Sequence, residues 1–470
     1  MEKIKLPESF ISVLNAALPK EDVGSLIEAI HGEPSISVRL NPKKGQNIID
    51  SLVLKSVPFS QHTKILKERP LFTADPGLHA GAYYVQESSS SIVGEIVSLL
   101  LEKSEETGSV VLDLCAAPGG KSTHVSSVLR QGDLLVANEV IQSRTPILIE
   151  NLTKWGDGNF VVTSTDAKNL GKMESLFSII VADMPCSGEG MFRKDPKSIE
   201  EWSIQNVALC CGRQQRIAFD IWPSLKEGGY FIYSTCTYNR QENEENVELI
   251  CGELGGKAII FDFPKDWPIY SDTEGMYRLL PHLNDGEGFF FSVIQKTSES
   301  DVYASPKKMK QPNVTAFPEE LQKIKNDWIG HGEGNYFSIV RGGDWHKHHP
   351  LLLQLLPGIK QVGVNIGMLD HKTWKPSAAF DLLSNIGTYY EKIDVEIDTA
   401  LTYYKREFVA KKLDKKGVIG LRWNALQLGT GNAVNNGINN LWPMNWRVLQ
   451  KNMEAKTILA VRTSEELSED

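Results

Sequence analysis

The sequence lacks the features of a membrane protein, and its overall charge does not favour binding to nucleic acid. No apolar run in its 470 residues approaches the length needed to span a bilayer, and the start, MEKIKLPESF, lacks the apolar core of a secretory signal. The formal net charge of -9 argues against bulk electrostatic capture of nucleic acid, so such a partner would have to meet local basic patches. We therefore expect a cytoplasmic chain without membrane contact.

Cysteine is scarce as well. Six cysteines in a chain of this length do not form a disulfide framework, and none has the spacing of zinc ligands. The histidines at positions 346, 348 and 349 lack flanking Cys or carboxylate ligands, so we expect no metal site. Free cysteine usually packs as a small buried hydrophobe, and we expect this of Cys210, Cys211 and Cys251.

The stretch VVLDLCAAPGGKSTH, residues 110–124, lacks the glycine spacing of dinucleotide- and phosphate-binding loops. Its apolar half predicts a buried central strand, and Pro118, Gly119 and Gly120 predict a sharp turn into a helix that leaves backbone N–H groups free for a ligand. Twenty residues after Gly119, Glu139 has the spacing of an acid that binds ribose hydroxyls. A ribose-bearing ligand without phosphates, such as S-adenosylmethionine, fits this pattern, although an ordinary strand–helix turn explains CAAPGGK alone equally well.

Apolar runs and helix-like segments alternate along the middle of the chain. Strands are expected at 110–115, 134–138, 160–164, 178–182 and 229–235, and helices from 122, over 143–154, over 203–221 and over 241–254. This alternation predicts a parallel, doubly wound α/β sheet of the Rossmann-like kind, whose ligands lie beyond the carboxyl ends of the strands. Candidate site residues follow the five strands in turn: Cys115 and Lys121, Glu139, Asp166, Asp183 and Cys186, and Cys236.

Two thiols and a carboxylate in that pocket indicate chemistry on a pyrimidine ring. A thiolate can add to carbon 6 and push electron density to carbon 5, which then takes a methyl group from the adjacent donor. A second thiol can help to expel the first, and Asp183 can stabilise charge on the ring. The residues alone do not assign Cys186 and Cys236 between attack and release, and either one alone could be a buried structural thiol.

Several segments resemble, in order, the motifs of the Sun/Fmu-type RNA (cytosine-5) methyltransferases, and within them the RsmF-like ribosomal RNA enzymes. These segments are DLCAAPGGKSTH, NEV at 138–140, Asp166, DMPCSGEGMFRKD and STCTYNRQENEENV, and RLLPHLNDGEGFFFSVIQK resembles the closing motif of the same domain. The one departure is Met184, where the family commonly has a smaller residue or proline. We expect it to change packing rather than chemistry.

The resemblance implies S-adenosylmethionine as cofactor and the cytosine-5 chemistry as the activity. It makes Cys236 the nucleophile, Cys186 the releasing thiol, and Asp183 a contact to cofactor and cytosine. Glu139 would bind the ribose, Asp166 would lie near the adenine, and Lys121 would lie close to the reacting centre. The rest of the cofactor would lie against Cys115, Ala116, Ala117, Pro118, Gly119, Gly120 and Lys121.

The implied substrate is RNA, with 16S ribosomal RNA of the small subunit expected first and transfer RNA as an alternative. The target base has to be unstacked, because a ring carbon is shielded inside a duplex. An alternative of another class is an RNA-binding ribosome assembly factor that has lost turnover, but the retained Cys236, Cys186 and Asp183 argue against it. We expect the chain to act as a monomer.

Length and composition predict several domains. We expect a small α+β RNA-binding domain at 1–75, the methyltransferase domain at 76–297, a polar linker at 298–315 and an intermediate small domain at 316–394. Because NNGINNLWPMNWRV resembles the C-terminal domain of the RsmF-like enzymes, a PUA-like RNA-binding β domain is expected at 395–470.

Three basic clusters are candidates for contacts to RNA phosphates, with a solvated surface as the plainer alternative. They are Arg39, Lys43 and Lys44; Arg193, Lys194 and Lys197; and Lys411, Lys412, Lys415, Lys416 and Arg422. In addition, Ser88 or Ser89 is expected to cap the helix that leads into the first central strand.

Overall fold

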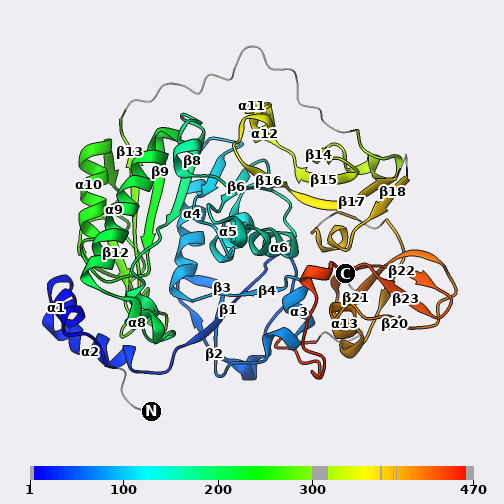
Figure 1. The fold of residues 1–470 in the computed structure, drawn as a ribbon, viewed down its shortest axis with the longest axis horizontal. Helices are drawn as coiled ribbons and strands as arrows, with labels where there is room; N and C mark the ends of the chain where they lie inside the picture. Colours follow the sequence, from blue (N-terminus) through cyan, green and yellow to red (C-terminus); the bar gives the residue numbers. More distant parts are fainter. Residues whose placement is uncertain (1–4, 299–315, 371–372, 385, 388, 462–470) are drawn as a thin grey trace.

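The computed structural model describes residues 5–298, 316–370, 373–384, 386–387 and 389–461. Within these residues the strands form four sheets, and the largest, with ten strands, lies at the centre of the molecule (Figure 1). The linker expected at 298–315 lies outside the described residues except for its first residue. No described helix is long and apolar enough to cross a membrane.

Five parallel strands form the middle of the central sheet, in the order β7-β6-β5-β8-β9. Their bounds are Val110–Asp113 (β5), Leu134–Asn138 (β6), Phe160–Thr163 (β7), Phe177–Asp183 (β8) and Leu225–Thr235 (β9). The chain builds outward from β5 first on one side and then on the other. The predicted doubly wound α/β sheet is therefore confirmed, and its strand order reverses between β5 and β8.

Helices cover both faces of this sheet. Val111 of β5 packs into a core with one group of helices, whereas its neighbour Leu112 packs into a core with another group. The first group is α4 (Ile92–Glu102), α5 (Gly120–Val128) and α6 (Thr145–Trp155), and the second is α7 (Ala167–Gly171), α9 (Ile204–Ile221) and α10 (Glu244–Leu254). Burial on both faces explains why these strands read as continuous apolar runs.

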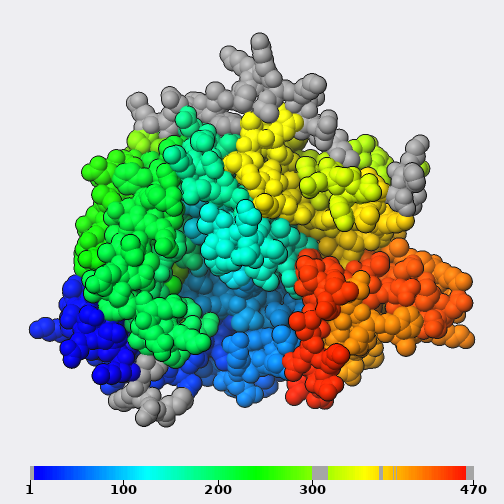
Figure 2. Space-filling view, viewed as in Figure 1, coloured from blue at the N-terminus to red at the C-terminus, as the bar shows by residue number. Residues whose placement is uncertain are grey.

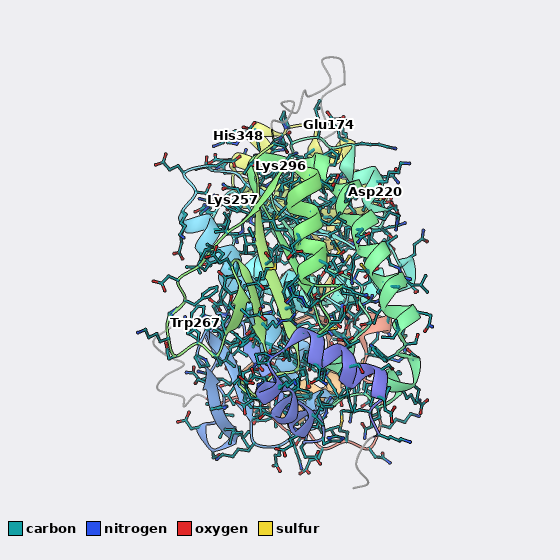
Figure 3. All side chains as sticks on the ribbon, turned by 90° about the vertical axis from the view of Figure 1, so that its left-hand side faces the viewer. Glu174, Asp220, Lys257, Trp267, Lys296 and His348 are labelled. Atoms are coloured by element: carbon teal, nitrogen blue, oxygen red, sulfur yellow. The ribbon has the colours of Figure 1, made fainter. Side chains whose placement is uncertain are left out.

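Antiparallel strands extend both edges of the central sheet. Beside β9 come β13 (Phe289–Lys296), β12 (Met276–Leu279) and β11 (Tyr270–Thr273), and β10 (Gly256–Ala258) also pairs with β13. Lys296 is buried and donates to the Leu225 carbonyl oxygen at 2.8 Å, at the amino end of β9. Figure 3 shows Lys296 and Lys257 near this end of the sheet. At the other edge, β16 (Ile359–Val362) pairs with β7, so a strand from residues 316–394 completes the central sheet.

The N-terminal part consists of a helical pair and an antiparallel sheet of order β2-β3-β1-β4. The elements are α1 (Glu8–Ala17), α2 (Lys20–Ile30), β1 (Ile36–Leu40), β2 (Val53–Val57), β3 (Ser60–Leu66), α3 (Pro76–His79) and β4 (Tyr83–Val85). Because β4 pairs with β1, the sheet continues past residue 75.

Helix α1 packs against segments that follow β8 and β9. The Phe10 ring is fully buried, with its centroid 4.9 Å from that of Phe192 and 5.6 Å from that of Trp202. Tyr238 belongs to the same apolar cluster. The N-terminal helices therefore support the loops at the carboxyl ends of β8 and β9.

Two further sheets follow the central unit. The first has the order β14-β15-β17-β18, and the second has the order β19-β21-β22-β23-β20. Their strands are β14 (Trp328–Glu333), β15 (Tyr336–Arg341), β17 (Val364–Asp370), β18 (Thr373–Pro376), β19 (Lys392–Asp394), β20 (Val409–Ala410), β21 (Gly417–Trp423), β22 (Leu426–Val434) and β23 (Gly437–Asn440). The helices are α11 (Asp344–His348), α12 (Leu352–Leu355) and α13 (Ile397–Tyr404), and α8 (Lys197–Glu201) precedes α9.

The end of the described chain packs against its beginning. The Ile49 amide donates to the Ile458 carbonyl oxygen at 2.8 Å, and the Ala460 amide donates to that of Asn47 at 2.8 Å. In Figure 2 the red C-terminal residues lie against the blue N-terminal part and the cyan part of the central unit. The N-terminal and C-terminal parts thus share one core.

The expectation of exposed basic side chains is wrong for Arg39 and Lys44. Arg39 is buried, lies over the Trp155 ring at 4.4 Å and donates to the Thr123 hydroxyl at 2.7 Å. Lys44 donates to the Leu382 carbonyl oxygen at 2.6 Å. These contacts join segments far apart in the chain, which explains why a local charge pattern did not predict them. The neighbouring Lys43 is exposed but pairs with buried Asp157 at 2.7 Å.

Acidic side chains pair with part of the C-terminal basic cluster. Arg422 binds Asp394 through two hydrogen bonds of 2.7 and 2.8 Å, and Lys415 pairs with Glu391 at 2.7 Å. Lys412 and Lys416 belong to the same cluster, and their side chains are exposed.

The predicted serine cap is wrong, because Glu87 caps this turn. Its carboxylate accepts hydrogen bonds from the Ser89 and Ser90 amides at 2.9 and 2.8 Å. Neither Ser88 nor Ser91, at the N-cap positions of the 3-10 turn and of α4, makes a side-chain capping bond.

The turn from β5 into α5 buries a carboxyl group. Asp113 ends β5 and accepts a 2.6 Å hydrogen bond from the Ser122 hydroxyl, while its Oδ1 has no partner. Burial raises the pKa of Asp113 to about 7. Gly119 has φ +116°, a left-handed conformation that favours glycine, so the expected tight turn is present.

Replacing Phe10 with alanine should destabilise the N-terminal helices on the central unit. Loss of a fully buried phenylalanine costs about 3–5 kcal/mol. The urea midpoint of the transition that exposes Trp202 should fall, as followed by tryptophan fluorescence. Leu54→Ala, at an exposed residue, is the control, and equal midpoints for the two variants would contradict the packing role.

Replacing Asp113 with asparagine should change how stability depends on pH. The folded chain holds this proton up to a pKa of about 7, whereas an unfolded aspartate releases it near about 4. The unsubstituted chain should therefore lose unfolding free energy relative to the variant as pH rises from about 4 to about 7. Urea unfolding across this interval measures the difference, and a difference independent of pH would contradict the prediction.

Candidate active site

The two sulfur atoms expected in one pocket lie side by side. β8 and β9 pair in parallel with Asp183 opposite Ser234, so the loops after these strands start at the same edge of the sheet. Cys186 and Cys236 lie in those loops, both half-buried, and their Sγ atoms are 3.2 Å apart. One pyrimidine carbon can therefore lie within reach of both sulfurs.

The two thiols differ in their surroundings. The hydrogen bond with Cys236 raises the pKa of the Cys186 thiol well above its usual value, and burial raises it further. The contact between the sulfurs and burial thus favour the neutral form of Cys186.

An ion pair lies beside the thiols. The Lys121 ammonium group is 2.8 Å from the Asp183 carboxylate, which also accepts a 3.0 Å hydrogen bond from the Ser234 hydroxyl. Burial alone would lower the pKa of Lys121, but the charge and hydrogen bond of Asp183 outweigh burial and raise it. The Lys121 ammonium group also lies 5.3 Å from the Phe289 ring centroid, so it is held in place as a fixed positive charge.

The turn at residues 115–121 and Glu139 are joined through Arg144. The Arg144 guanidinium donates to the Ala117 carbonyl oxygen at 2.5 Å and lies 3.4 Å from the Glu139 carboxylate. Glu139 also accepts a hydrogen bond from the Ile141 amide at 2.8 Å. The turn itself is bonded to the neighbouring strand, since the Ala116 amide donates to the Asn138 carbonyl oxygen at 2.8 Å. The structure thus brings the turn and Glu139 to adjacent strand ends.

Asp166 is partly exposed, whereas Cys115 lies among the charged residues of this group. Asp166 caps α7 by accepting from the Lys168 amide at 3.0 Å, and it pairs with Arg216 at 3.4 Å on the exposed side. Burial raises the pKa of the Cys115 thiol, which is therefore kept protonated. Cys115 can line a pocket but is not suited to nucleophilic attack.

Arg193 is not available to RNA as expected. Its side chain is largely buried, forms a 2.8 Å ion pair with Glu287 and donates to the Gly286 carbonyl oxygen at 2.7 Å. Arg193 instead joins the loop after Cys186 to the loop before β13. Lys194 and Lys197, its neighbours in the same cluster, are exposed.

The sequence interpretation missed four polar residues of the site: Asp113, Arg144, Glu189 and Glu242. All four lie within or next to the recognised motifs. A charged residue next to glycine in a loop at a strand end is the signal that could have indicated Glu189. The backbone donors that bind Glu189 and Glu242 lie about fifty residues away in the chain, so spacing alone could not assign these two residues.

The residues present fit S-adenosylmethionine. Asp113 Oδ1 is a buried acceptor without a partner at the end of β5, Glu139 follows β6, and a Pro-Gly-Gly turn lies between them in sequence. In the described part of the chain no three His, Cys, Asp or Glu side chains are grouped to hold a metal ion.

Two family models match the chain. Residues 98–295 match 16S rRNA methyltransferase RsmB/F, and residues 6–88 match the N-terminal domain of 16S rRNA methyltransferase RsmF. The first range contains the central sheet up to β13, and the second contains the N-terminal helices and sheet.

The curated relatives that align with the chain are named as small-subunit ribosomal RNA methyltransferases. Ribosomal RNA small subunit methyltransferase F of Psychromonas ingrahamii is 27% identical, in an alignment that covers 94% of this chain and 97% of that protein. The protein of the same name from Shewanella piezotolerans is 33% identical, over 52% of this chain and 51% of that protein.

The fold is also similar to a solved structure, that of NSun6 from Pyrococcus horikoshii with SFG. The TM-score is 0.50 and the sequence identity 19%, with 62% of this chain and 99% of that chain covered. At this identity the likeness concerns the fold alone. The two family models and the nearly full-length alignment place the function more narrowly: this chain belongs to the RsmB/F family of 16S rRNA methyltransferases.

Proposed function

We propose that the chain transfers a methyl group from S-adenosylmethionine to carbon 5 of a cytosine in 16S rRNA. The observation that carries the proposal is the 3.2 Å contact between two thiols beyond the carboxyl ends of β8 and β9, next to a turn suited to a ribose-bearing donor. The descriptions of the two matching family models support 16S rRNA as the substrate. No feature of the described residues favours transfer RNA.

We assign the attack to Cys236. Its sulfur forms a bond with carbon 6 of the cytosine, and the displaced electron pair moves to carbon 5. The bound cofactor supplies an electrophilic methyl group there. The Asp183 carboxylate, held by Lys121 and Ser234, is suited to accept a hydrogen bond from the ring's amine and thereby to orient the base for the attack.

We assign release to Cys186. After methylation the proton on carbon 5 has to leave to a base, and the electron pair of that bond restores the double bond as the carbon 6–sulfur bond breaks. Cys186 lies in contact with the sulfur that must depart. This contact supports a role in the second half of the reaction rather than in the attack.

The remaining roles concern binding. We propose that residues 115–121 and Asp183 contact the cofactor, with Glu139 on the ribose and Asp166 near the adenine. Exposed Lys194 and Lys197 are candidates for phosphate contacts near the target base. We further propose that residues 1–75 and a PUA-like unit at 395–470 hold the RNA, and that the chain acts in the cytoplasm as a monomer.

Cys236→Ala should abolish methyl transfer while S-adenosylmethionine binding stays unchanged, because the variant keeps the turn that faces the cofactor. Transfer of labelled methyl groups to unmodified 16S rRNA measures the first effect, and calorimetric titration measures the second. Cys251→Ala, a half-buried cysteine of α10, should methylate normally. Retained turnover in Cys236→Ala would overturn the nucleophile assignment, and labelling of transfer RNA instead would overturn the substrate.

Cys186→Ala should allow attack but slow release, so that protein stays covalently bound to RNA. Denaturing gel electrophoresis with labelled RNA should show a retarded band that unsubstituted protein lacks. The double variant Cys186→Ala/Cys236→Ala should give no such band. An active Cys186→Ala protein without the band would contradict the release role.

A further inference from the structure

Two buried glutamates, one from each loop, connect the loops that carry the two thiols. Glu189, three residues after Cys186, is fully buried and accepts hydrogen bonds from the Tyr238 and Asn239 amides at 2.7 and 3.0 Å. Both amides belong to the loop of Cys236. The Cys186 loop thus sends a carboxylate to the backbone of the other thiol's loop.

Glu242 makes the reverse connection. It follows Cys236 by six residues, is fully buried, and accepts a 3.0 Å hydrogen bond from the Ser187 amide, directly after Cys186. A backbone bond of 2.8 Å from the Gly190 amide to the Cys236 carbonyl oxygen lies between the two connections. Each thiol is therefore within three residues of a bond that reaches the other loop.

Further donors fix both carboxylates. The Asn239 side-chain amide donates to Glu189 at 3.0 Å and to Glu242 at 2.8 Å, the Trp202 indole donates to Glu189 at 3.0 Å, and Gln214 donates to Glu242 at 2.8 Å. An ionised carboxylate has about four acceptor positions and no donor. A glutamine at either position would direct its own side-chain N–H group at one of these N–H donors. The contacts at both positions therefore require a carboxylate.

We propose that Glu189 and Glu242 are positioning residues that hold the Cys186 and Cys236 sulfurs in contact, and thereby set how fast the covalent adduct is released. This inference rests on the proposed roles of the two thiols. Neither glutamate touches the reacting atoms. Reaction rates are sensitive to placement, since a shift of about 1 Å can cost on the order of a hundredfold.

Disulfide formation measures the sulfur–sulfur placement without any methyl transfer. Oxidised glutathione converts the two thiols into a disulfide and is itself reduced to two glutathione molecules. The equilibrium constant, measured in glutathione buffers by alkylation and mass spectrometry, reports how well the fold holds the sulfurs together. For Glu242→Gln and Glu189→Gln we expect it to fall about tenfold or more, because effective molarity depends steeply on geometry.

Asp75→Asn is the matched control. Asp75 is also a buried carboxylate, and it accepts from the Gly77 and Ile458 amides at 2.8 and 2.9 Å, away from both thiol loops. It should lower the unfolding temperature without changing the disulfide constant. If Glu189→Gln does not fold, Glu242→Gln decides alone. If the disulfide equilibrium constant of Glu242→Gln lies within about twofold of that of the unsubstituted protein, the inference is overturned.

Steady-state kinetics separate the inference from the proposed function. Glu242→Gln should leave the KM for RNA nearly unchanged, lower kcat, and increase the fraction of protein bound covalently to RNA. Glu242→Asp, which keeps the charge, should recover part of kcat. A lower disulfide constant with unchanged methylation would support the positioning role and overturn the assigned roles of the thiols.

Discussion

The parallel pairing of β8 with β9 is the constraint on which the site depends. Parallel strands end at the same edge of a sheet, and the register that sets Asp183 opposite Ser234 starts both thiol loops at the same level. The loops then need only short connections to bring Cys186 and Cys236 to 3.2 Å. A different register would separate the sulfurs, whatever the loop sequences.

The parts of this arrangement that depend on local pattern could be predicted from the sequence. Buried parallel strands appear in the sequence as apolar runs. The sequence therefore predicted the five parallel strands and the polar residues that follow them. The cap at Glu87, the burial of Arg39 and the addition of β16 to the central sheet were not predicted. Each depends on partners whose position is known only once the chain has folded.

The same reason applies within the site. The spacing of Cys186 and Cys236 from their strands predicted a shared pocket, because strand direction alone fixes it. Glu189 and Glu242 reach across between loops about fifty residues apart in sequence, and a charged residue in a polar loop reads as exposed. Their burial follows from N–H groups of the opposite loop that need an acceptor.

The packing of Phe10 on Phe192 and Trp202 has a consequence for synthesis of the chain. The ribosome makes α1 first, whereas its apolar partners emerge only after β8 has been translated. Until then only α2 can cover the apolar face of α1, and exposed apolar faces invite aggregation or binding by chaperones. The packing of α1 on the loop after β8 can therefore form only once residue 202 has been translated.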